Sequence, residues 1–213
     1  MIPEQLVETP QPATPRKLDK PKLLIGEGKD EVLVFEAFLS HLGILDIQVE
    51  DYCGKDRLPD YLDALSKQSG FAQIKSIGVT RDADADAAGA FASLCDHLSR
   101  RSLVTPAASG NVRPGTPSVG VMIFPDGRNE GMLEDLCLAA LGADSLTKCI
   151  DEYFKCVEAA RNAPPKKIAK ARIHAWLAAQ EPPDLRLGIA AQKGLIPWNN
   201  NSFDQLRDFL TAL

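Results

Sequence analysis

The stretch SIGVTRDADADAAGAF, residues 76–91, places Asp82, Asp84 and Asp86 directly after an apolar run and before a helical pattern. An apolar run that ends in polar residues is typical of a buried strand followed by a loop. Carboxylates spaced this closely repel one another unless a cation or a proton compensates their charge. The stretch therefore predicts a strand whose carboxyl end carries a charged site.

The same order of strand and helix occurs four times up to residue 142. Strands are predicted in PKLLIG (21–26), IQVEDYCG (47–54), IKSIGVT (74–80) and SVGVMIFPD (118–126). Helical spacing of apolar residues follows each strand, over 29–43, 57–70, 86–102 and 131–142. Such alternation predicts an α/β fold with a four-stranded, mainly parallel sheet flanked by helices.

The chain divides into three parts by composition. Residues 1–21 carry five prolines and few large apolar side chains, which predicts a flexible arm. Residues 22–142 form the α/β domain. Residues 143–213 read as a C-terminal helical extension packed on that domain, with two helices joined by Asn-Ala-Pro-Pro, a short RLGIAAQKG segment and a final amphipathic helix.

The composition of the 213 residues, 45% apolar and 25% charged, is that of a globular protein. Without an apolar run of roughly 20 residues or a signal pattern, we expect no membrane contact and a cytoplasmic location. The five cysteines form no Cys-x-x-Cys pair, and we expect Cys95, Cys137 and Cys149 to be small buried side chains. The net charge of −5 argues against a uniformly basic, DNA-coating surface.

Acidic residues follow several of the predicted strands. Glu27 and Glu31 come after the first strand, Asp82 and Asp84 after the third, and Glu134 lies beyond the fourth. Because functional groups in open α/β sheets lie at the carboxyl ends of the strands, we expect these acids at one edge of the sheet.

Two familiar motifs fit the DADAD sequence poorly. An EF-hand calcium loop that starts at Asp82 would need glycine and glutamate where Ala87 and Ser93 stand. A phosphatase-type aspartyl nucleophile also uses Asp-x-Asp after a strand. In such sites the strand is the first of the chain and a small hydroxylic residue follows the motif, whereas here the strand is the third and Asp86 follows.

Two other interpretations remain open for these acids. Asp86 precedes AAGAFASL and is suited to cap the following helix. Asp82 and Asp84 are suited to Mg²⁺ or Mn²⁺, which prefer carboxylate oxygens, with Glu27 as a third ligand from the first strand.

Taken together, GEGKDE after the first strand and DADAD after the third resemble the Toprim domain. This domain is shared by type IA and II topoisomerases, DnaG-type primases, RecR-like repair proteins and OLD-family nucleases. The resemblance covers residues 22–142 and implies a Toprim-like, Rossmann-type fold. Glu27 matches the family's glutamate, and Asp82 and Asp84 match its aspartate pair.

Further residues are similar to the OLD-type branch of that family. Glu31 lies where those members carry a second acid, with Asp30 as the neighbouring option, and Glu134 in GMLED and Lys193 in AAQKG match a later acid and a lysine. The whole chain also resembles a small stand-alone Toprim family of uncharacterised function.

The resemblance implies a divalent-metal-dependent nuclease. Its Mg²⁺ or Mn²⁺ ligands would be Glu27, Glu31, Asp82, Asp84, Asp86 and Glu134, and its catalytic residues would be Glu27, Asp82, Asp84 and Lys193. Glu27 is alternatively a general base, and Lys29 or Lys193 would place a cation against transition-state charge.

The expected partner is nucleic acid, DNA in preference to RNA. The basic stretch RNAPPKKIAKAR (161–172) predicts phosphate contacts, and the candidate nucleic-acid-binding residues are Lys29, Lys166, Lys167 and Lys170. Two alternatives stay open: a non-catalytic, RecR-like binding or assembly module in a repair or defence complex, and phosphotransfer or hydrolysis on a small nucleotide. A second copy of the chain or another protein is a further possible partner.

Overall fold

A five-stranded sheet forms the centre of the computed structural model, which describes residues 17–213. The strand order is β2-β1-β3-β5-β4, and the first four strands in that order run parallel. β4 pairs antiparallel with β5 at one edge. The strands are β1 (Lys22–Gly26), β2 (Ile47–Asp51), β3 (Ser76–Asp82), β4 (Val112–Arg113) and β5 (Ser118–Phe124).

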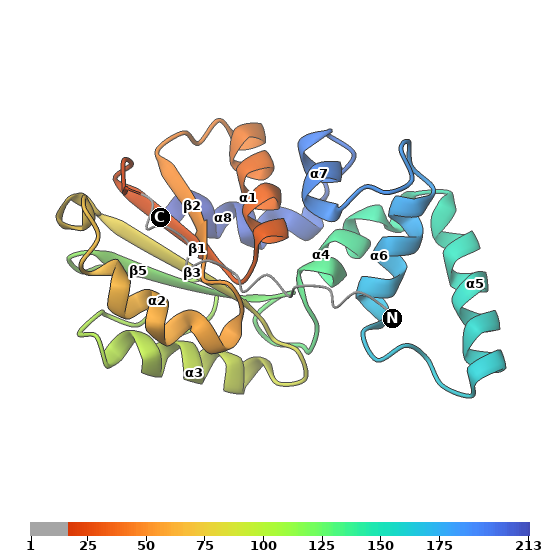
Figure 1. The fold of residues 1–213 in the computed structure, drawn as a ribbon, viewed down its shortest axis with the longest axis horizontal. Helices are drawn as coiled ribbons and strands as arrows, with labels where there is room; N and C mark the ends of the chain where they lie inside the picture. The colour runs from red at the N-terminus through yellow and green to blue at the C-terminus, as the bar shows by residue number, and fades with distance from the viewer. Residues whose placement is uncertain (1–16) are drawn as a thin grey trace, which may run out of the picture.

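Helices cover both faces of this sheet, as the α/β pattern predicts (Figure 1). Successive residues of a strand point to opposite faces. In β1, accordingly, Leu24 packs in the core under α1 (Lys29–Leu42) and α8 (Asp204–Ala212). Leu23 and Ile25 pack in the core under α2 (Leu58–Leu65) and α3 (Ala87–Ser99).

Two strand glycines allow α8 to lie close against the sheet. A Cβ on Gly78 would stand 2.7 Å from a methyl of Leu213, and one on Gly120 would stand 2.6 Å from the ring of Phe209. Both distances are shorter than real Cβ contacts, so larger residues would push α8 away. The C-terminal extension is therefore part of the main core, because α8 covers one sheet face.

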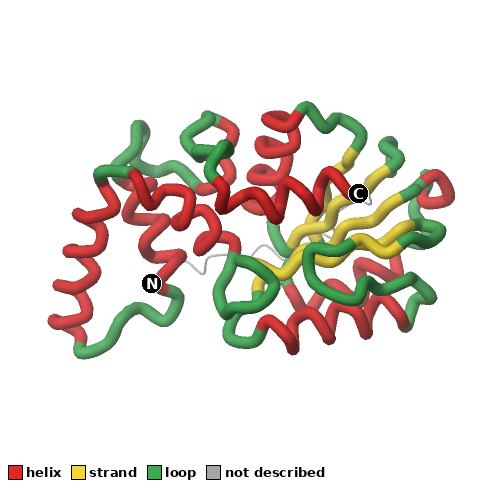
Figure 2. Tube along the Cα trace, turned by 180° about the vertical axis from the view of Figure 1, so that it is seen from behind, coloured by secondary structure: helices red, strands yellow, loops and turns green. Residues whose placement is uncertain are grey.

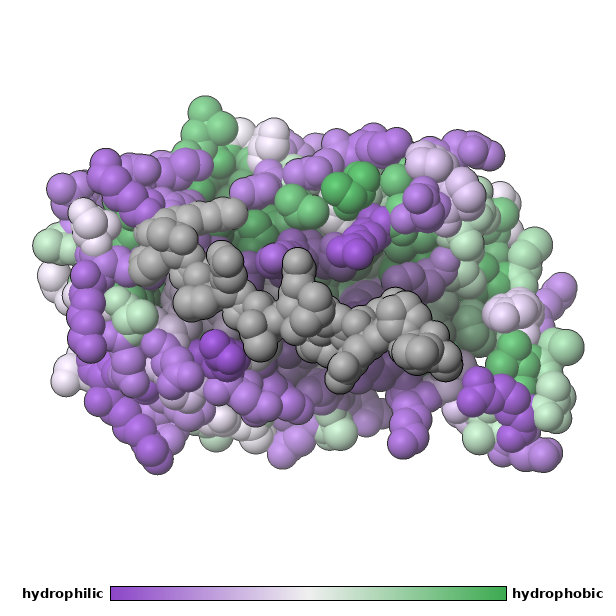
Figure 3. Space-filling view, viewed as in Figure 1, coloured by the Kyte–Doolittle hydropathy of each residue, from purple (hydrophilic) through white to green (hydrophobic). Residues whose placement is uncertain are grey.

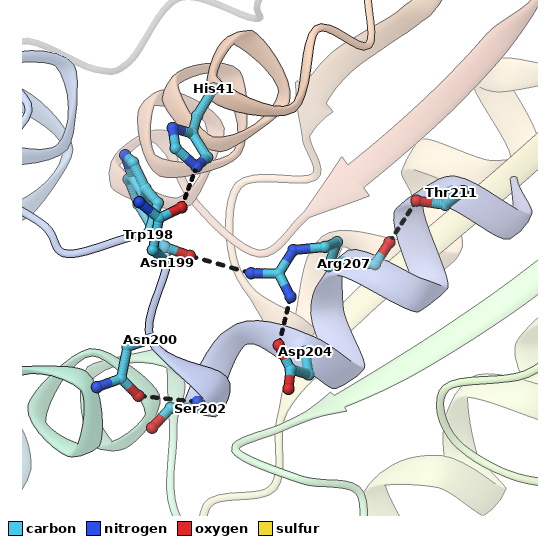
Figure 4. A network of polar contacts seen from close by, with 8 residues as sticks. All are labelled: His41, Trp198, Asn199, Asn200, Ser202, Asp204, Arg207 and Thr211. Atoms are coloured by element: carbon cyan, nitrogen blue, oxygen red, sulfur yellow. Dashed lines mark hydrogen bonds and ion pairs between the residues drawn. The ribbon is translucent and has the colours of Figure 1, made fainter.

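Polar contacts fix the turn that leads into α8 (Figure 4). Arg207 donates to the backbone carbonyl of Trp198 at 3.1 Å and pairs with Asp204. The side chain of Asn200 accepts from the backbone N–H of Ser202 at 2.9 Å. These contacts set the direction in which α8 crosses the sheet.

The remaining helices lie beyond the carboxyl ends of the strands (Figures 1 and 2). α4 packs against α6, α6 against α5, and α7 lies along α1. Their bounds are α4 (Leu133–Ala140), α5 (Leu146–Arg161), α6 (Ile168–Ala178) and α7 (Leu187–Gln192). Apolar residues show on the surface toward the end of the molecule where α5 lies (Figure 3). Within residues 17–213 no helix is long and apolar enough to cross a membrane.

The segment before β1 is held against β2 by side-chain hydrogen bonds. Gln48 donates through its side-chain amide to the backbone carbonyl of Lys17 at 3.2 Å and accepts from the backbone N–H of Asp19 at 2.9 Å. Lys20 adds an ammonium contact of 3.0 Å to the carbonyl of Ile47.

Three expectations from the sequence need correction or restriction. The sheet has a fifth strand, because β4 is too short, and too closely surrounded by Gly and Pro, to give a periodic signal. Cys137 is buried as expected, but Cys95 is only partly buried and Cys149 is exposed, because α6 covers only one side of α5. Most of the predicted flexible arm, residues 1–16, lies outside the described residues.

Candidate functional site

The carboxyl ends of β1 and β3 lie side by side, since the two strands pair in parallel from Lys22 with Ser76 to Ile25 with Val79. The chain leaves β1 through Glu27 and enters α1, whose first turn carries Glu31. The last residue of β3 is Asp82. Parallel pairing thus brings together acids that lie far apart in the sequence, as the sequence predicts.

Glu31 receives two hydrogen bonds on one carboxylate oxygen. The backbone N–H of Glu27 donates to Oε2 at 2.9 Å, and the hydroxyl of Thr80 donates to the same atom at 3.3 Å. A Cβ on Gly26 would lie 2.9 Å from this oxygen, so glycine leaves the space that the carboxylate fills. Burial raises the pKa of Glu31 well above its usual range, and the charge of Asp82 raises it further.

Asp82 points toward the start of α4. Its Oδ1 accepts from the backbone N–H of Leu133 at 2.9 Å, in the first turn of that helix. Burial raises the pKa of Asp82 to about 7 against the lowering effect of that hydrogen bond, and the charges of Glu134, Glu27 and Asp84 raise it further. Without a cation beside them, the carboxyl groups of Asp82 and Glu31 therefore favour the protonated form.

Asp84 is exposed and lies between two lysines. Its backbone has φ 50°, and its N–H and carbonyl both bond to Gly131, at 2.9 and 2.8 Å. Its two carboxylate oxygens each lie 3.6 Å from an ammonium group, one of Lys55 and the other of Lys167. Lys55 stands in a short 3₁₀ turn after β2, and Lys167 immediately precedes α6.

The two other predicted acidic ligands have separate partners. Glu134, in the first turn of α4, lies 3.5 Å from the ammonium of Lys170. Asp86 caps α3 by accepting from the backbone N–H of Gly89 at 2.9 Å, which confirms its predicted capping role.

The predicted lysines fall into two groups. Lys167 and Lys170 contact acids of the site. Lys29, Lys166 and Lys193 are exposed and make no ion pair among the described residues. Of these, Lys193 directly follows α7, a helix that packs on α1 near Asp30.

Sequence reasoning missed three residues at this edge. Lys55 follows the second strand in YCGKD, so the rule that the loops after strands carry the site would have identified it. Thr80 lies two residues before Asp82 and donates to Glu31. Tyr52 is buried and donates from its hydroxyl to the backbone carbonyl of Thr80 at 3.1 Å, which ties β2 to β3.

The acidic residues at this edge of the sheet have the chemistry that a divalent cation requires of its ligands. Glu27, Glu31, Asp82 and Asp84 supply only hard carboxylate oxygens, which Mg²⁺ and Mn²⁺ prefer. The raised pKa of Asp82 and of Glu31 marks a place where positive charge would be favourable. Within residues 17–213, however, no three acidic, His or Cys side chains stand close enough together to hold an ion as placed, so ligation requires side-chain rotation.

Comparisons with other proteins match most of the chain to one family. The family model described as "Protein of unknown function (DUF3226)" matches residues 21–213. A search of curated protein sequences found no significant match. Among solved structures, the C-terminal region of the Xanthomonas campestris pv. campestris OLD protein is similar, with 14% identity, a TM-score of 0.39, and coverage of 92% of this chain and 87% of that one. This likeness is too low to carry an argument about function.

Proposed function

We propose that this chain, which belongs to the family of proteins of unknown function DUF3226, carries out divalent-metal-dependent phosphodiester chemistry on nucleic acid. It would act as a nuclease of the Toprim type. One observation carries the proposal: Glu27 and Glu31 follow β1 beside the end of β3, which carries Asp82, and the charges of Asp82 and Glu27 both raise the pKa of Glu31. This arrangement agrees with the motif order that resembles Toprim domains.

In this proposal the acids would have two roles. Glu27, Asp82 and Asp84 are the central ligands of Mg²⁺ or Mn²⁺, and Glu31, Asp86 and Glu134 complete or support the site. Bound there, the cation would neutralise phosphate charge and supply an activated water. Glu31 positions the loop of Glu27 through its hydrogen bond from the Glu27 N–H.

Basic side chains next to the acids would hold the substrate. Lys167 lies 3.6 Å from Asp84 and Lys170 lies 3.5 Å from Glu134, so their ammonium groups would be near a phosphate bound at these acids. In this proposal Lys29 and Lys166 contact nucleic acid farther out, and Lys193 places a cation against transition-state charge.

A second function, a non-catalytic Toprim-type binding or assembly module, also has an observation in its favour. The described acids do not form a ready cation cage, and lysines neutralise Asp84 and Glu134. A protein that uses this edge only to bind nucleic acid or a partner would not need to coordinate a metal ion.

Cleavage assays separate the two functions. Plasmid and single-stranded DNA are incubated with the protein in Mg²⁺, in Mn²⁺ and in EDTA. A nuclease cuts only with metal, and Asp82→Asn and Glu27→Gln each lose at least a hundredfold in rate, the scale of a lost metal or electrostatic interaction. Asp208→Asn, on an exposed part of α8, serves as the matched carboxylate control and cuts like the wild type. Cleavage by Asp82→Asn at the wild-type rate would refute the nuclease.

A further inference from the structure

Three lysines, one after β2 and two at the start of α6, already lie beside acids of the site. Lys55, after β2, and Lys167, before α6, flank the two oxygens of Asp84 at 3.6 Å each. Lys170, in the first turn of α6, lies 3.5 Å from Glu134. Two of the carboxylates that would hold a cation therefore have positive charge beside them.

These contacts have the character of exchangeable ion pairs. Charge-assisted hydrogen bonds are typically 2.7–2.9 Å long, so separations of 3.5–3.6 Å are loose. The side chains of Lys55, Lys167 and Lys170 are 51%, 63% and 55% exposed. The two pairs with Asp84, itself 40% exposed, are of the kind that contributes little to stability, whereas Glu134 is only 14% exposed.

The lysines can change partners without a movement of α6. That helix is anchored by buried side chains of Ala169, Ile173 and Trp176, and the indole N–H of Trp176 donates to Asp144 at 3.0 Å. Arg172 pairs with Asp151 of α5. Only the flexible ends of the lysine side chains need to rotate, because the backbone that carries Lys167 and Lys170 is fixed by this packing.

We propose that Lys55, Lys167 and Lys170 are resident counter-ions that exchange partners when a divalent cation arrives, an inference that rests on the proposed function. A cation bound by Asp84 and Glu134 repels the neighbouring ammonium groups, since like charges a few ångströms apart are unfavourable. The displaced lysines then face the phosphates of a nucleic-acid backbone, the anions that would accompany the cation. Before metal binding, the lysines neutralise the acids at this edge of the sheet. After metal binding, the same lysines are available to bind phosphate.

If this exchange occurs, replacing one of these lysines should change the affinities for metal and for nucleic acid in opposite directions. Removing a competing lysine tightens metal binding and weakens nucleic-acid binding. We therefore expect Lys167→Met and Lys55→Met each to bind Mn²⁺ about two- to fivefold more tightly, as the loss of one exposed ion pair allows. Each variant should also bind nucleic acid more weakly, with a salt dependence reduced by about 0.7 in logarithmic slope per lost phosphate contact.

The test is calorimetric titration of the full chain with MnCl₂, together with binding of a fluorescent single-stranded phosphorothioate oligonucleotide in Mn²⁺. Lys166→Met is the matched control for the Mn²⁺ titration alone, because Lys166 is itself a proposed nucleic-acid contact: it removes the same charge one residue from Lys167, at a side chain without an ion pair in the described structure. The wild type and this control should bind Mn²⁺ equally.

The outcomes separate the two proposals. A wild type that binds Mn²⁺, with Lys167→Met and Lys166→Met shifting the affinity equally or not at all, overturns the counter-ion exchange alone. A wild type that binds no Mn²⁺ at millimolar concentration overturns the metal-dependent function and the exchange with it. Tighter Mn²⁺ binding by Lys167→Met combined with weaker oligonucleotide binding supports both.

Discussion

The backbone N–H of Glu27 donates to the carboxylate of Glu31 at 2.9 Å, so the two acids that follow β1 are linked through the main chain of one and the side chain of the other. Glu31 thereby fixes the loop that carries Glu27. The same carboxylate oxygen accepts a hydrogen bond from the hydroxyl of Thr80 in β3. Glu31 therefore also links the ends of β1 and β3.

Gly26→Ala tests the space around this carboxylate. The added Cβ would lie 2.9 Å from Oε2 of Glu31 and 3.1 Å from the ring of Phe35, so we expect unfolding to become easier by about 1–3 kcal/mol. Urea denaturation monitors the change. Gly28→Ala is the control: a Cβ there meets nothing within 4 Å, and the cost should stay under about 1 kcal/mol. Equal losses for the two variants would contradict the packing described.

Asp82→Asn should stabilise the protein at alkaline pH without metal. Because the pKa of Asp82 is raised from 3.8 to about 7, the folded state binds a proton that the unfolded state releases, so wild-type stability falls as pH rises from about 4 to about 7. At pH 8 in EDTA the variant should be more stable by about 1–3 kcal/mol. At pH 3.5 the difference should be small. Chemical denaturation at both pH values measures the difference in unfolding free energy between the variant and the wild type. A difference that does not depend on pH would disprove the raised pKa of Asp82.

Divalent cations should stabilise the wild type under the metal-site proposal. At ten times the Kd, Mn²⁺ adds about 1.4 kcal/mol, or about 3–6 °C in melting temperature for a chain of this size. Asp84→Asn should show a smaller shift at the same concentration, because a proposed ligand is lost. Differential scanning calorimetry with and without Mn²⁺ gives the values. No shift in the wild type would count against the site.

Gly120→Ala tests the close packing of α8 on the sheet. Its Cβ would stand 2.6 Å from the Phe209 ring, so the variant should lose about 1–3 kcal/mol in unfolding free energy. Gly142→Ala, where a Cβ meets nothing within 4 Å, should cost under about 1 kcal/mol. Thermal unfolding compares the two. If Gly120→Ala is as stable as Gly142→Ala, α8 does not press on β5 as described.

The strands and the acids at their carboxyl ends could be predicted from the sequence because both are local signals. An apolar run marks β3, and the parallel order of the strands places Asp82 beside the loop of Glu27. The capping role of Asp86 is local in the same way. These features depend on only a few consecutive residues and on the general rule for open α/β sheets.

The counter-ions could not be predicted because they depend on contacts between distant segments. Nothing local in the basic stretch distinguishes Lys167, which reaches Asp84, from Lys166, which does not. The direction in which α6 packs decides between them. Similarly, the fact that Glu31 bonds to the backbone of Glu27 follows from how α1 starts after Gly28, which acidic spacing alone does not specify.

The amide of Gln48 has a consequence for association between molecules. An uncovered edge strand offers its backbone to the strands of other chains and promotes aggregation. Here Gln48 holds the backbone of Lys17 and Asp19 along β2, and Lys20 covers the carbonyl of Ile47. These contacts hold the segment before β1 beside β2, so a strand from another molecule that added here would first have to displace them.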